Sequence, residues 1–210
     1  MNVGKAIVHV VEDDRSVRVA ITRLLQRAGF ETRGYGSAGE FLLAEREDAP
    51  GCIVLDVALP GVSGMELHAG LLKEEDAPPV IFLTGRGDLS TSVRAMKAGA
   101  VDFLSKPVER AVLLGAIETA LIRDVENRVA RKHLRHLRAR YDKLTARERV
   151  ILTRVVEGKP NKSIALEVGT SIRTIKAHRA QVMQKLEVKS LPELVRTADE
   201  LGRAGCILQT

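Results

Sequence analysis

One carboxylate in this chain stands where it could do chemistry. Asp56 directly follows the apolar run 52–55, and Pro60 and Gly61 then prevent a helix or strand from continuing. A short apolar run bounded by turn residues is typical of a strand buried on both faces. Open α/β sheets place ligand chemistry at the carboxyl ends of their strands, so Asp56 is a candidate reactive carboxylate. The same pattern would also suit an Asp that caps the turn or the following helix.

Polar residues also follow three further apolar runs. Glu12 and Asp13 come after the first run, Thr84 after a later one, and Lys106 closely after the last. Parallel strands present their carboxyl ends at one edge of a sheet, so we expect these side chains to meet Asp56 there. Three neighbouring carboxylates repel one another, and Lys106 together with a divalent cation would supply the opposite charge. Mg²⁺ binds carboxylate, water and phosphate oxygens, so the set predicts Mg²⁺-assisted phosphoryl chemistry.

Strands alternating with helices would bring these residues together. Strands are predicted at 6–11, 31–36, 52–55, 80–83 and 101–104. Helical spacing of apolar residues predicts helices at 15–28, through 43 after the N-cap Ser37, at 65–72, and from Asp88 or Ser90 to 97, with a last one from about 108. Such alternation forms a parallel sheet with right-handed crossovers. The first half is therefore predicted to be a doubly wound α/β domain with a five-stranded parallel sheet.

The residues at these strand ends resemble those of a known family. The segments concerned are 10–14, 55–56, 83–85 and 105–107. In chain order, over about residues 4–122, they resemble the receiver domain of two-component response regulators. The resemblance implies a flavodoxin-like topology and transfer of a phosphoryl group from a sensor histidine kinase to the Asp56 carboxylate.

The resemblance also implies roles for single residues. Asp13, Asp56 and the backbone carbonyl of Ala58 would bind Mg²⁺, and Glu12 would act through a water. Lys106 would pair with the phosphoryl oxygens. Glu12 stands where many receiver domains have Asp, which is expected to shift the metal geometry slightly.

Two residues are expected to form a conformational switch. The Thr84 hydroxyl would turn toward the phosphoryl group, and Phe103 would follow into the space that it leaves. Phe103 could also be a plain core aromatic residue, and the two roles are compatible. Ala58 and Arg86, placed near the phosphoryl group by the resemblance, are expected to influence its lifetime.

The two halves of the chain carry opposite net charge. Residues 1–120 hold 13 Lys and Arg against 17 Asp and Glu, whereas residues 121–210 hold 20 against 10. A strongly basic half is suited to a polyanion. The absence of Trp, with only two Tyr, argues against a protein that stacks on single-stranded bases. Double-stranded DNA is therefore the expected partner.

The two halves are predicted to be separate domains joined by a linker. The predicted limits are a receiver domain at 1–122, a basic linker at 123–143 and a DNA-binding domain at 144–210. Apolar residues keep a helical spacing through the linker, which contains no Gly or Pro. This pattern indicates a solvated helix or coil. A dimerising helix along Leu121, Val125 and Val129 is an alternative with weaker support.

The last domain is predicted to be an all-α unit of four short helices. A capping box of Thr145 and Glu148 precedes the first helix, and Ser171 caps the third. The second and third helices are separated only by a tight turn that contains Gly169. Two helices joined in this way form a helix-turn-helix, whose second helix can enter the major groove of DNA.

Basic and small residues share the outward face of the third helix, which would let it approach DNA closely. The segments 144–148, 158–165, 174–179 and 185–186 resemble the LuxR-type helix-turn-helix of FixJ/NarL response regulators, over about residues 141–205. The residues best placed for DNA contact by that resemblance are Lys162, Arg173, Thr174, Lys176 and Arg179. The fourth helix would form a dimer interface.

These observations predict a cytoplasmic transcriptional regulator that is not an enzyme beyond its own phosphorylation and dephosphorylation. Phosphorylation of Asp56 would promote homodimerisation and binding to a two-half-site operator, with RNA polymerase as a further contact. The alternatives are a phosphorylation-independent DNA-binding protein with a vestigial receiver and a phosphotransferase with an aspartyl-phosphate intermediate. No apolar run approaches the ~20 residues that cross a bilayer, so no membrane partner is expected.

Overall fold

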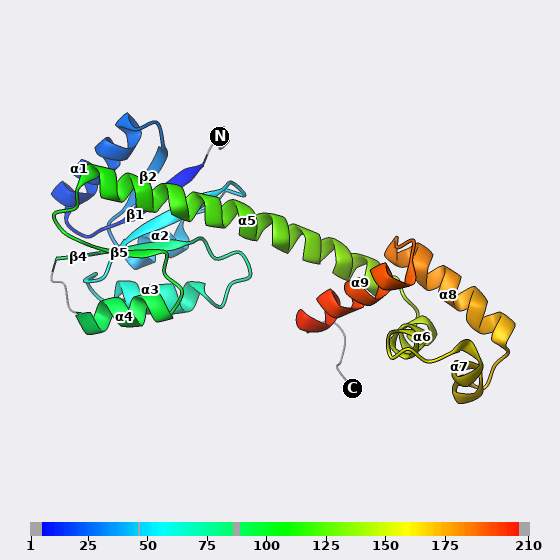
Figure 1. The fold of residues 1–210 in the computed structure, drawn as a ribbon. Helices are drawn as coiled ribbons and strands as arrows, with labels where there is room; N and C mark the ends of the chain where they lie inside the picture. Colours follow the sequence, from blue (N-terminus) through cyan, green and yellow to red (C-terminus); the bar gives the residue numbers. More distant parts are fainter. Residues whose placement is uncertain (1–5, 46, 86–88, 206–210) are drawn as a thin grey trace. The chain divides into compact units, whose positions relative to one another are not determined.

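The computed structural model describes residues 6–45, 47–85 and 89–205. The chain divides into two compact units, residues 1–128 and residues 129–210, and each is described separately. Figure 1 shows the sheet and its helices in the first unit and an all-helical second unit.

The first unit is built on a parallel sheet. Its strands are β1 (Ile7–Val11), β2 (Glu31–Tyr35), β3 (Gly51–Asp56), β4 (Val80–Thr84) and β5 (Asp102–Ser105). They lie in the order β2-β1-β3-β4-β5, and each neighbouring pair is parallel. The helices between and after them are α1 (Arg15–Arg27), α2 (Ala38–Leu43), α3 (Gly64–Leu71), α4 (Leu89–Lys97) and α5 (Arg110–Asp142). The predicted doubly wound five-stranded parallel sheet is confirmed.

Helices cover both faces of this sheet (Figure 1). Apolar residues of α1 and α5 pack on one face, and residues of α2, α3 and α4 pack on the other. The side chains of β3 point alternately into the two cores: Cys52 and Val54 face the first, and Ile53 and Leu55 face the second. Because side chains alternate along a strand, a strand covered on both faces must be apolar throughout. This explains the uninterrupted apolar run before Asp56.

The strand register brings the polar strand ends into line. Val11, the last residue of β1, pairs with Leu55, so Glu12 and Asp56 both lie one step further along. In the same way, Thr84 at the end of β4 pairs with Ser105 at the end of β5. Lys106 follows directly, and its N–H donates to the Thr84 carbonyl at 2.7 Å. The predicted convergence at one edge therefore follows from the register.

The turns at this edge are held by helix caps. Asp14 is the N-cap of α1, and its carboxylate accepts from the N–H groups of Ser16 and Val17. Ser63 and Glu66 form a capping box at the start of α3. Such side chains satisfy N–H groups that have no partner within the helix. The loops after β1 and β3 are fixed in this way next to the strand ends.

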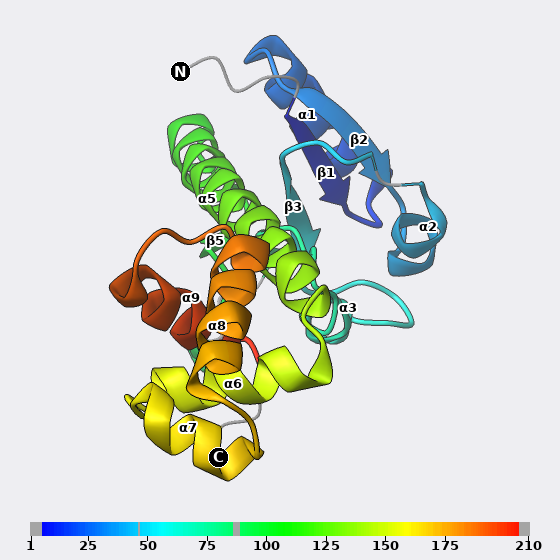
Figure 2. The same cartoon turned by 90° about the vertical axis from the view of Figure 1, so that its right-hand side faces the viewer.

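Among its described residues, the second unit contains four short helices beside the last turns of α5. They are α6 (Ala146–Val156), α7 (Asn161–Val168), α8 (Ile172–Leu186) and α9 (Leu191–Arg203). Figure 2 shows these four helices gathered round one another. Their core takes Ile151, Ile164, Ile175 and Leu201 from the four helices in turn, each at most 1% exposed. The predicted four-helix domain is confirmed.

The helix-turn-helix itself is formed by α7 and α8. Gly169 ends α7 with a left-handed backbone (φ 67°), a conformation that glycine adopts without strain. The Ser171 side chain then accepts from the Thr174 N–H and caps α8. Three residues thus suffice to turn the chain from one helix into the next.

Helix α5 is unbroken for 33 residues. Leu121 is buried in the core of the first unit, and Leu137 and Tyr141 are buried in the core of the second. The suggested stripe of Leu121, Val125 and Val129 does not share one environment: Leu121 is 3% exposed, whereas Val125 and Val129 are 39% and 66% exposed. Residues 123–142 of the predicted linker segment are helical.

Candidate phosphoacceptor site and DNA-binding face

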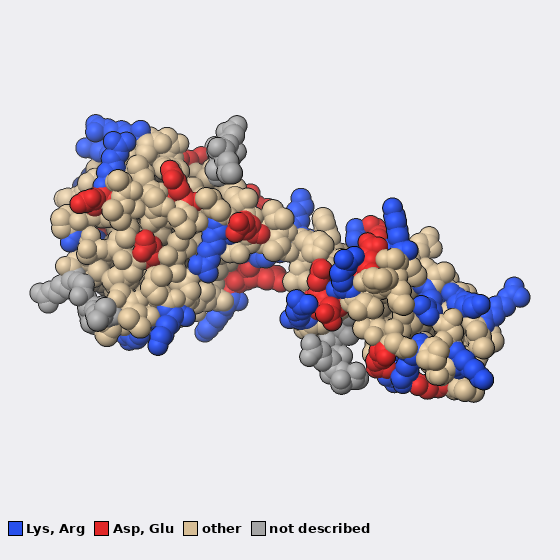
Figure 3. All heavy atoms as spheres, viewed as in Figure 1, with Lys and Arg blue, Asp and Glu red and all other residues tan. Residues whose placement is uncertain are grey.

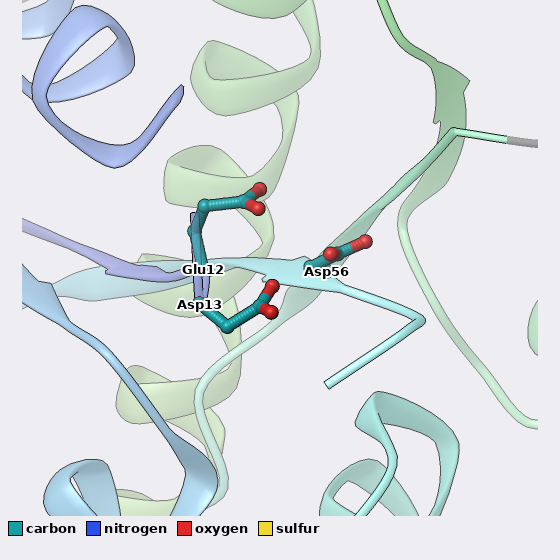
Figure 4. Close-up of side chains that lie close together, drawn as sticks. All are labelled: Glu12, Asp13 and Asp56. Atoms are coloured by element: carbon teal, nitrogen blue, oxygen red, sulfur yellow. The ribbon is translucent and has the colours of Figure 1, made fainter. Parts of the chain in front are cut away.

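Three carboxylates converge where β1 and β3 end. Glu12 and Asp13 follow β1, Asp56 ends β3, and one oxygen of each lies within 4.8 Å of the others. In Figure 4 the carboxylates of Glu12 and Asp13 point toward the side on which Asp56 lies. Glu12 is 1% exposed and Asp56 is 4% exposed, whereas Asp13 is exposed. The group therefore has a buried side and a side open to solvent.

Lys106 provides the positive charge that this group needs. Its Nζ lies 2.5 Å from Glu12 Oε2 and 3.1 Å from Asp56 Oδ2. The lysine follows β5 at the edge of the sheet, and its side chain reaches back across the strand ends. One ammonium group thus contacts the ends of both acid-bearing strands, as the sequence predicted.

The electrostatics of these groups reflect burial and close contact. Burial raises the pKa of Glu12, and the charge of Asp56 raises it further, while the Lys106 ammonium opposes the shift. For Lys106, burial alone would lower the pKa, but the hydrogen bonds and charges of Glu12 and Asp56 raise it above its usual value. Lys106 is therefore held as a cation inside the cluster.

The residues present fit a divalent cation. Asp56 Oδ1 is buried and has no hydrogen-bond partner among the described residues. Three carboxylates in reach of one another offer hard oxygen ligands, and the exposed position of Asp13 leaves room for water. Mg²⁺ commonly combines one or two carboxylates with water and phosphate oxygens. Ala58, whose carbonyl was expected as a ligand, is exposed two residues after Asp56.

The two residues of the expected switch lie on neighbouring strands. Thr84 ends β4 and is 6% exposed, one residue beyond Leu83, the register partner of Asp56. Phe103 on β5 is half-buried and packs against Phe82, with ring centroids 6.2 Å apart. Phe103 is thus a partly buried aromatic residue beside Thr84's strand. Arg86, also named from the resemblance, lies outside the described residues.

Gly64 is a residue of the site that sequence reasoning missed. A Cβ atom at this position would lie 2.1 Å from the carbonyl oxygen of Asp56, closer than any real contact. The Gly64 N–H donates to the Val57 carbonyl at 3.1 Å, so the start of α3 packs against the backbone that carries Asp56. A glycine directly after the helix cap Ser63 was the signal in the sequence.

The expected DNA-contact residues lie on α7 and α8. Lys162, Arg173 and Lys176 are exposed, whereas Thr174 and Arg179 are half-buried. Figure 3 shows Lys and Arg side chains standing out from this unit where α7 and the start of α8 lie in Figure 1. The basic face that the sequence predicted is therefore present on the second helix of the helix-turn-helix.

Two of these five residues also make contacts within the motif. Arg179 Nη1 donates to Asn161 Oδ1 at 2.6 Å and so joins α8 to the start of α7. The Thr174 hydroxyl lies 2.9 Å from the Ser171 hydroxyl at the cap of α8. Arg179 therefore helps to hold α8 against α7, and Thr174 contacts the cap of its own helix, roles that the sequence did not indicate.

Fold and site together define a class of protein: a receiver domain followed by a LuxR-type DNA-binding domain, as in two-component response regulators. Residues 8–118 match the response regulator receiver domain family, and residues 142–198 match the luxR family of bacterial regulatory proteins. The chain belongs to the response regulators of the FixJ/NarL type and is a phosphorylation-controlled regulator of transcription.

Its similarity to particular relatives extends over nearly the whole chain. Nodulation protein W of Bradyrhizobium diazoefficiens is 42% identical over 198 residues, covering 94% of this chain and 87% of that protein. The transcriptional regulatory protein FixJ of Rhizobium meliloti is 42% identical over 191 residues, covering 91% and 94%. Among solved structures, the response regulator StyR is 44% identical, with a TM-score of 0.79 and coverage of 94% and 100%.

Among the described residues, none of the helices combines the length and the apolar character that a bilayer crossing requires.

Proposed function

We propose that Asp56 is the residue that accepts the phosphoryl group, from a sensor histidine kinase. The observation that carries this proposal is the buried Oδ1 of Asp56, which has no hydrogen-bond partner among the residues that the structure describes and lies beside the Glu12, Asp13 and Lys106 side chains. An unpartnered carboxylate oxygen at a strand end is free to attack phosphorus. Its neighbours supply both a cation and further oxygen ligands.

In this mechanism the side chains either offset the charge of the phosphoryl group or hold it in position. Bound Mg²⁺ would be held by Asp13, Asp56 and the Ala58 carbonyl, with Glu12 through a water, and would offset the charge of the phosphoryl oxygens. Lys106 contacts Asp56 Oδ2 in the unphosphorylated protein and would bind a phosphoryl oxygen once Asp56 is modified. The group transferred forms a bond to an Asp56 oxygen as its bond to the kinase histidine breaks.

The bound phosphoryl group would then change the conformation at this edge of the sheet. The Thr84 hydroxyl would bond to the new phosphoryl oxygens, and the Phe103 ring would move toward the space left beside β4. A change on β4 and β5 alters the surface next to α4, where a second copy could bind. Homodimerisation would follow, and two helix-turn-helix units would bind two half-sites of an operator in duplex DNA.

DNA contact is assigned to the residues of α7 and α8. Lys162, Arg173 and Lys176 are exposed and free to reach phosphates, and Thr174 and Arg179 would contact DNA from the same face. A regulator bound at an operator would also contact RNA polymerase. Because its kinase and its DNA are inside the cell, we place the protein in the cytoplasm.

The proposed role is that of a switch rather than an enzyme that turns over substrate. A phosphotransferase with an aspartyl-phosphate intermediate would need a general acid near the nucleophile. Ala58, two residues after Asp56, has no acid to offer. The domains that divide this work are proposed to be 1–122, a linker at 123–143, and 144–210.

The proposal is tested by phosphorylation in vitro. Wild-type protein incubated with Mg²⁺ and acetyl phosphate is expected to gain the mass of one phosphoryl group, and the adduct is expected to be lost in base, as acyl phosphates are. Asp56→Asn is expected to gain nothing, since an amide cannot form the acyl phosphate. The matched control is Asp76→Asn in an exposed loop, which is expected to behave as wild type. An unmodified wild type, or an Asp56→Asn protein that is modified equally, would contradict the assignment.

A further inference from the structure

The side chain of one arginine binds two consecutive carbonyl groups in the turn that carries Glu12 and Asp13, and its backbone N–H binds the next. The Arg18 Nη1 donates to the Glu12 carbonyl at 2.5 Å and to the Asp13 carbonyl at 3.1 Å. The backbone N–H of Arg18 donates to the Asp14 carbonyl at 2.9 Å. The sheet still holds the Glu12 N–H, which donates to the Tyr35 carbonyl of β2 at 3.0 Å, and the Asp14 cap holds the start of α1. The Glu12 and Asp13 carbonyls between these two points accept from the Arg18 side chain.

Strand β2 leaves room for this side chain. A Cβ atom at Gly34 would lie 3.3 Å from Cγ and 3.4 Å from Cδ of Arg18, tighter than most real contacts. At Gly36 a Cβ atom would lie 3.5 Å from the Arg18 Nη1. The aliphatic part of Arg18 therefore passes over a strand position without a side chain and reaches the turn.

The position of this turn decides where two acid side chains point. Glu12 and Asp13 are adjacent, yet one is buried against Lys106 and the other is exposed. Both carboxylates nevertheless come within 4.8 Å of Asp56. Neighbouring carboxylates repel one another, and Lys106 offsets this repulsion at Glu12 and Asp56. A guanidinium bound to the Glu12 and Asp13 carbonyls both fixes the peptide between them and places a positive charge beside it.

We propose that Arg18 is a positioning residue of the divalent-cation site: it holds the β1–α1 turn so that Glu12 and Asp13 can act together with Asp56. Arg18 touches neither the metal nor the phosphoryl group. The inference rests on the proposed function, since it requires a cation at Glu12, Asp13 and Asp56. This role was not predictable from the sequence, because an arginine in the first turns of a helix is usually a solvated charge.

The first experiment measures Mg²⁺ binding to the unphosphorylated full-length protein by isothermal titration calorimetry. Arg18→Ala is expected to weaken Mg²⁺ binding about tenfold, as is usual for residues that support metal ligands. Arg15→Ala is the matched control, because Arg15 carries the same charge on the same helix and is exposed. It is expected to bind Mg²⁺ as wild type does. Binding to Arg18→Ala equal to that of the control overturns the inference.

Arg18→Lys separates charge from geometry. A lysine keeps the positive charge but cannot present a planar guanidinium to the carbonyls. It is expected to bind Mg²⁺ more weakly than wild type. Wild-type affinity in Arg18→Lys overturns the positioning role and leaves only a charge effect.

A kinetic measurement distinguishes positioning from a general structural defect. With acetyl phosphate as donor, the Mg²⁺ concentration at half-maximal phosphorylation is expected to rise about tenfold in Arg18→Ala. The rate at saturating Mg²⁺ is expected to stay that of wild type, because the metal then restores the arrangement. A lowered saturating rate with unchanged Mg²⁺ dependence overturns the inference.

Gly34→Ala tests the same contact without removing the arginine, in case Arg18→Ala fails to fold. The added methyl group is expected to displace the Arg18 stem and to raise the Mg²⁺ requirement, though less than Arg18→Ala does. An unchanged Mg²⁺ affinity in Gly34→Ala, if Arg18→Ala is unfolded, overturns the inference. If wild type itself binds no Mg²⁺, the proposed metal site fails, and the role of Arg18 fails with it.

Discussion

Glu12 and Lys106 approach to 2.5 Å, although one follows the first strand of the sheet and the other follows the last. Burial disfavours the charged form of each, yet each stabilises the other, and Asp56 shares the same ammonium at 3.1 Å. The presence of Glu at position 12, where many receivers have Asp, gives a side chain one methylene longer to make this contact. At the scale of single residues, the charge of each group in this cluster is stabilised by the opposite charge that it contacts.

A buried carboxylate in the other unit, Glu148, has the opposite electrostatic balance. Glu148 is 2% exposed and accepts from Lys185 Nζ at 2.6 and 2.9 Å, besides its place in the capping box with Thr145. Burial alone would raise the pKa of Glu148, but the hydrogen bonds from Lys185 and Thr145 lower it below its usual value. The pair joins α6 to α8.

We expect Glu148→Gln to lower the free energy of unfolding of the second unit by about 1–3 kcal/mol at neutral pH, because a charged hydrogen-bond acceptor is lost. A lowered pKa in the folded state gives stability that is complete above the pKa of the unfolded chain, about 4.3. That stability is lost as pH falls through the lower pKa of the folded protein. The difference between wild type and Glu148→Gln is therefore expected to shrink in acid, as measured by thermal unfolding at a series of pH values.

Asp199→Asn is the control for this measurement. Asp199 forms an exposed ion pair with Arg203, and such pairs contribute little to stability. It is expected to follow the wild-type pH dependence. A constant difference between wild type and Glu148→Gln at every pH would show that the carboxylate charge is not the cause.

At the scale of elements, α5 is bound to the first unit by more than its apolar face. Asp124 is 1% exposed and accepts from the Gly51 N–H at 3.0 Å and from the Arg128 Nε at 2.9 Å. Arg128 also donates to the Ala49 carbonyl at 2.6 Å and pairs with Asp48 at 2.5 Å. The part of α5 that the sequence suggested as a solvated linker is thus attached to the start of β3, the strand that ends at Asp56.

We expect Asp124→Ala to lower the free energy of unfolding of the first unit by about 2 kcal/mol, because the buried Gly51 N–H loses its acceptor. The local readout is hydrogen exchange at Gly51 and its neighbours, where protection is expected to fall. Glu126→Ala, an exposed acid on the same helix, removes the same charge and is expected to leave this protection unchanged. Equal protection in Asp124→Ala and wild type would show that this contact is not needed to hold the start of β3.

At the scale of the whole molecule, the two halves of the chain carry opposite net charge. The half with the acidic site carries more Asp and Glu than Lys and Arg, and the half with the helix-turn-helix carries twice as many Lys and Arg as Asp and Glu. A basic unit attracts the phosphates of DNA at long range, and an acidic centre attracts a divalent cation. Each unit therefore suits a partner of the opposite charge.

The DNA-binding role of this charge is testable at one exposed residue of α8. Lys176→Ala is expected to weaken binding to a mixed-sequence DNA duplex and to reduce the slope of log affinity against log salt concentration by about one. The physical reason is that each phosphate neutralised by a lysine releases one bound cation from the DNA, and the variant loses one such lysine. Lys73→Ala, an equal change of charge in the exposed loop after α3, is expected to keep the wild-type slope. An unchanged slope in Lys176→Ala would remove that residue from the interface.

Much of this fold was predictable because its signals are local. Apolar runs predicted the strands, helical spacing predicted the helices, and Ser37, Thr145 and Ser171 were correctly predicted as helix caps. The strand ends predicted which residues gather, because all carboxyl ends of a parallel sheet lie on one edge. The approach of Glu12, Asp13 and Asp56 to one another follows from that rule.

The sequence alone thus determined the two kinds of unit, the candidate nucleophile and its charged neighbours. Only the tertiary structure decided the contacts that support them: Arg18 on the carbonyls after β1, Gly64 against the Asp56 carbonyl, and Asp124 on the N–H of Gly51. Asp124 and Gly51 are 73 residues apart in the chain. Periodicity and turn residues report on neighbours within a few positions, whereas such contacts depend on how distant elements pack, which no local pattern encodes.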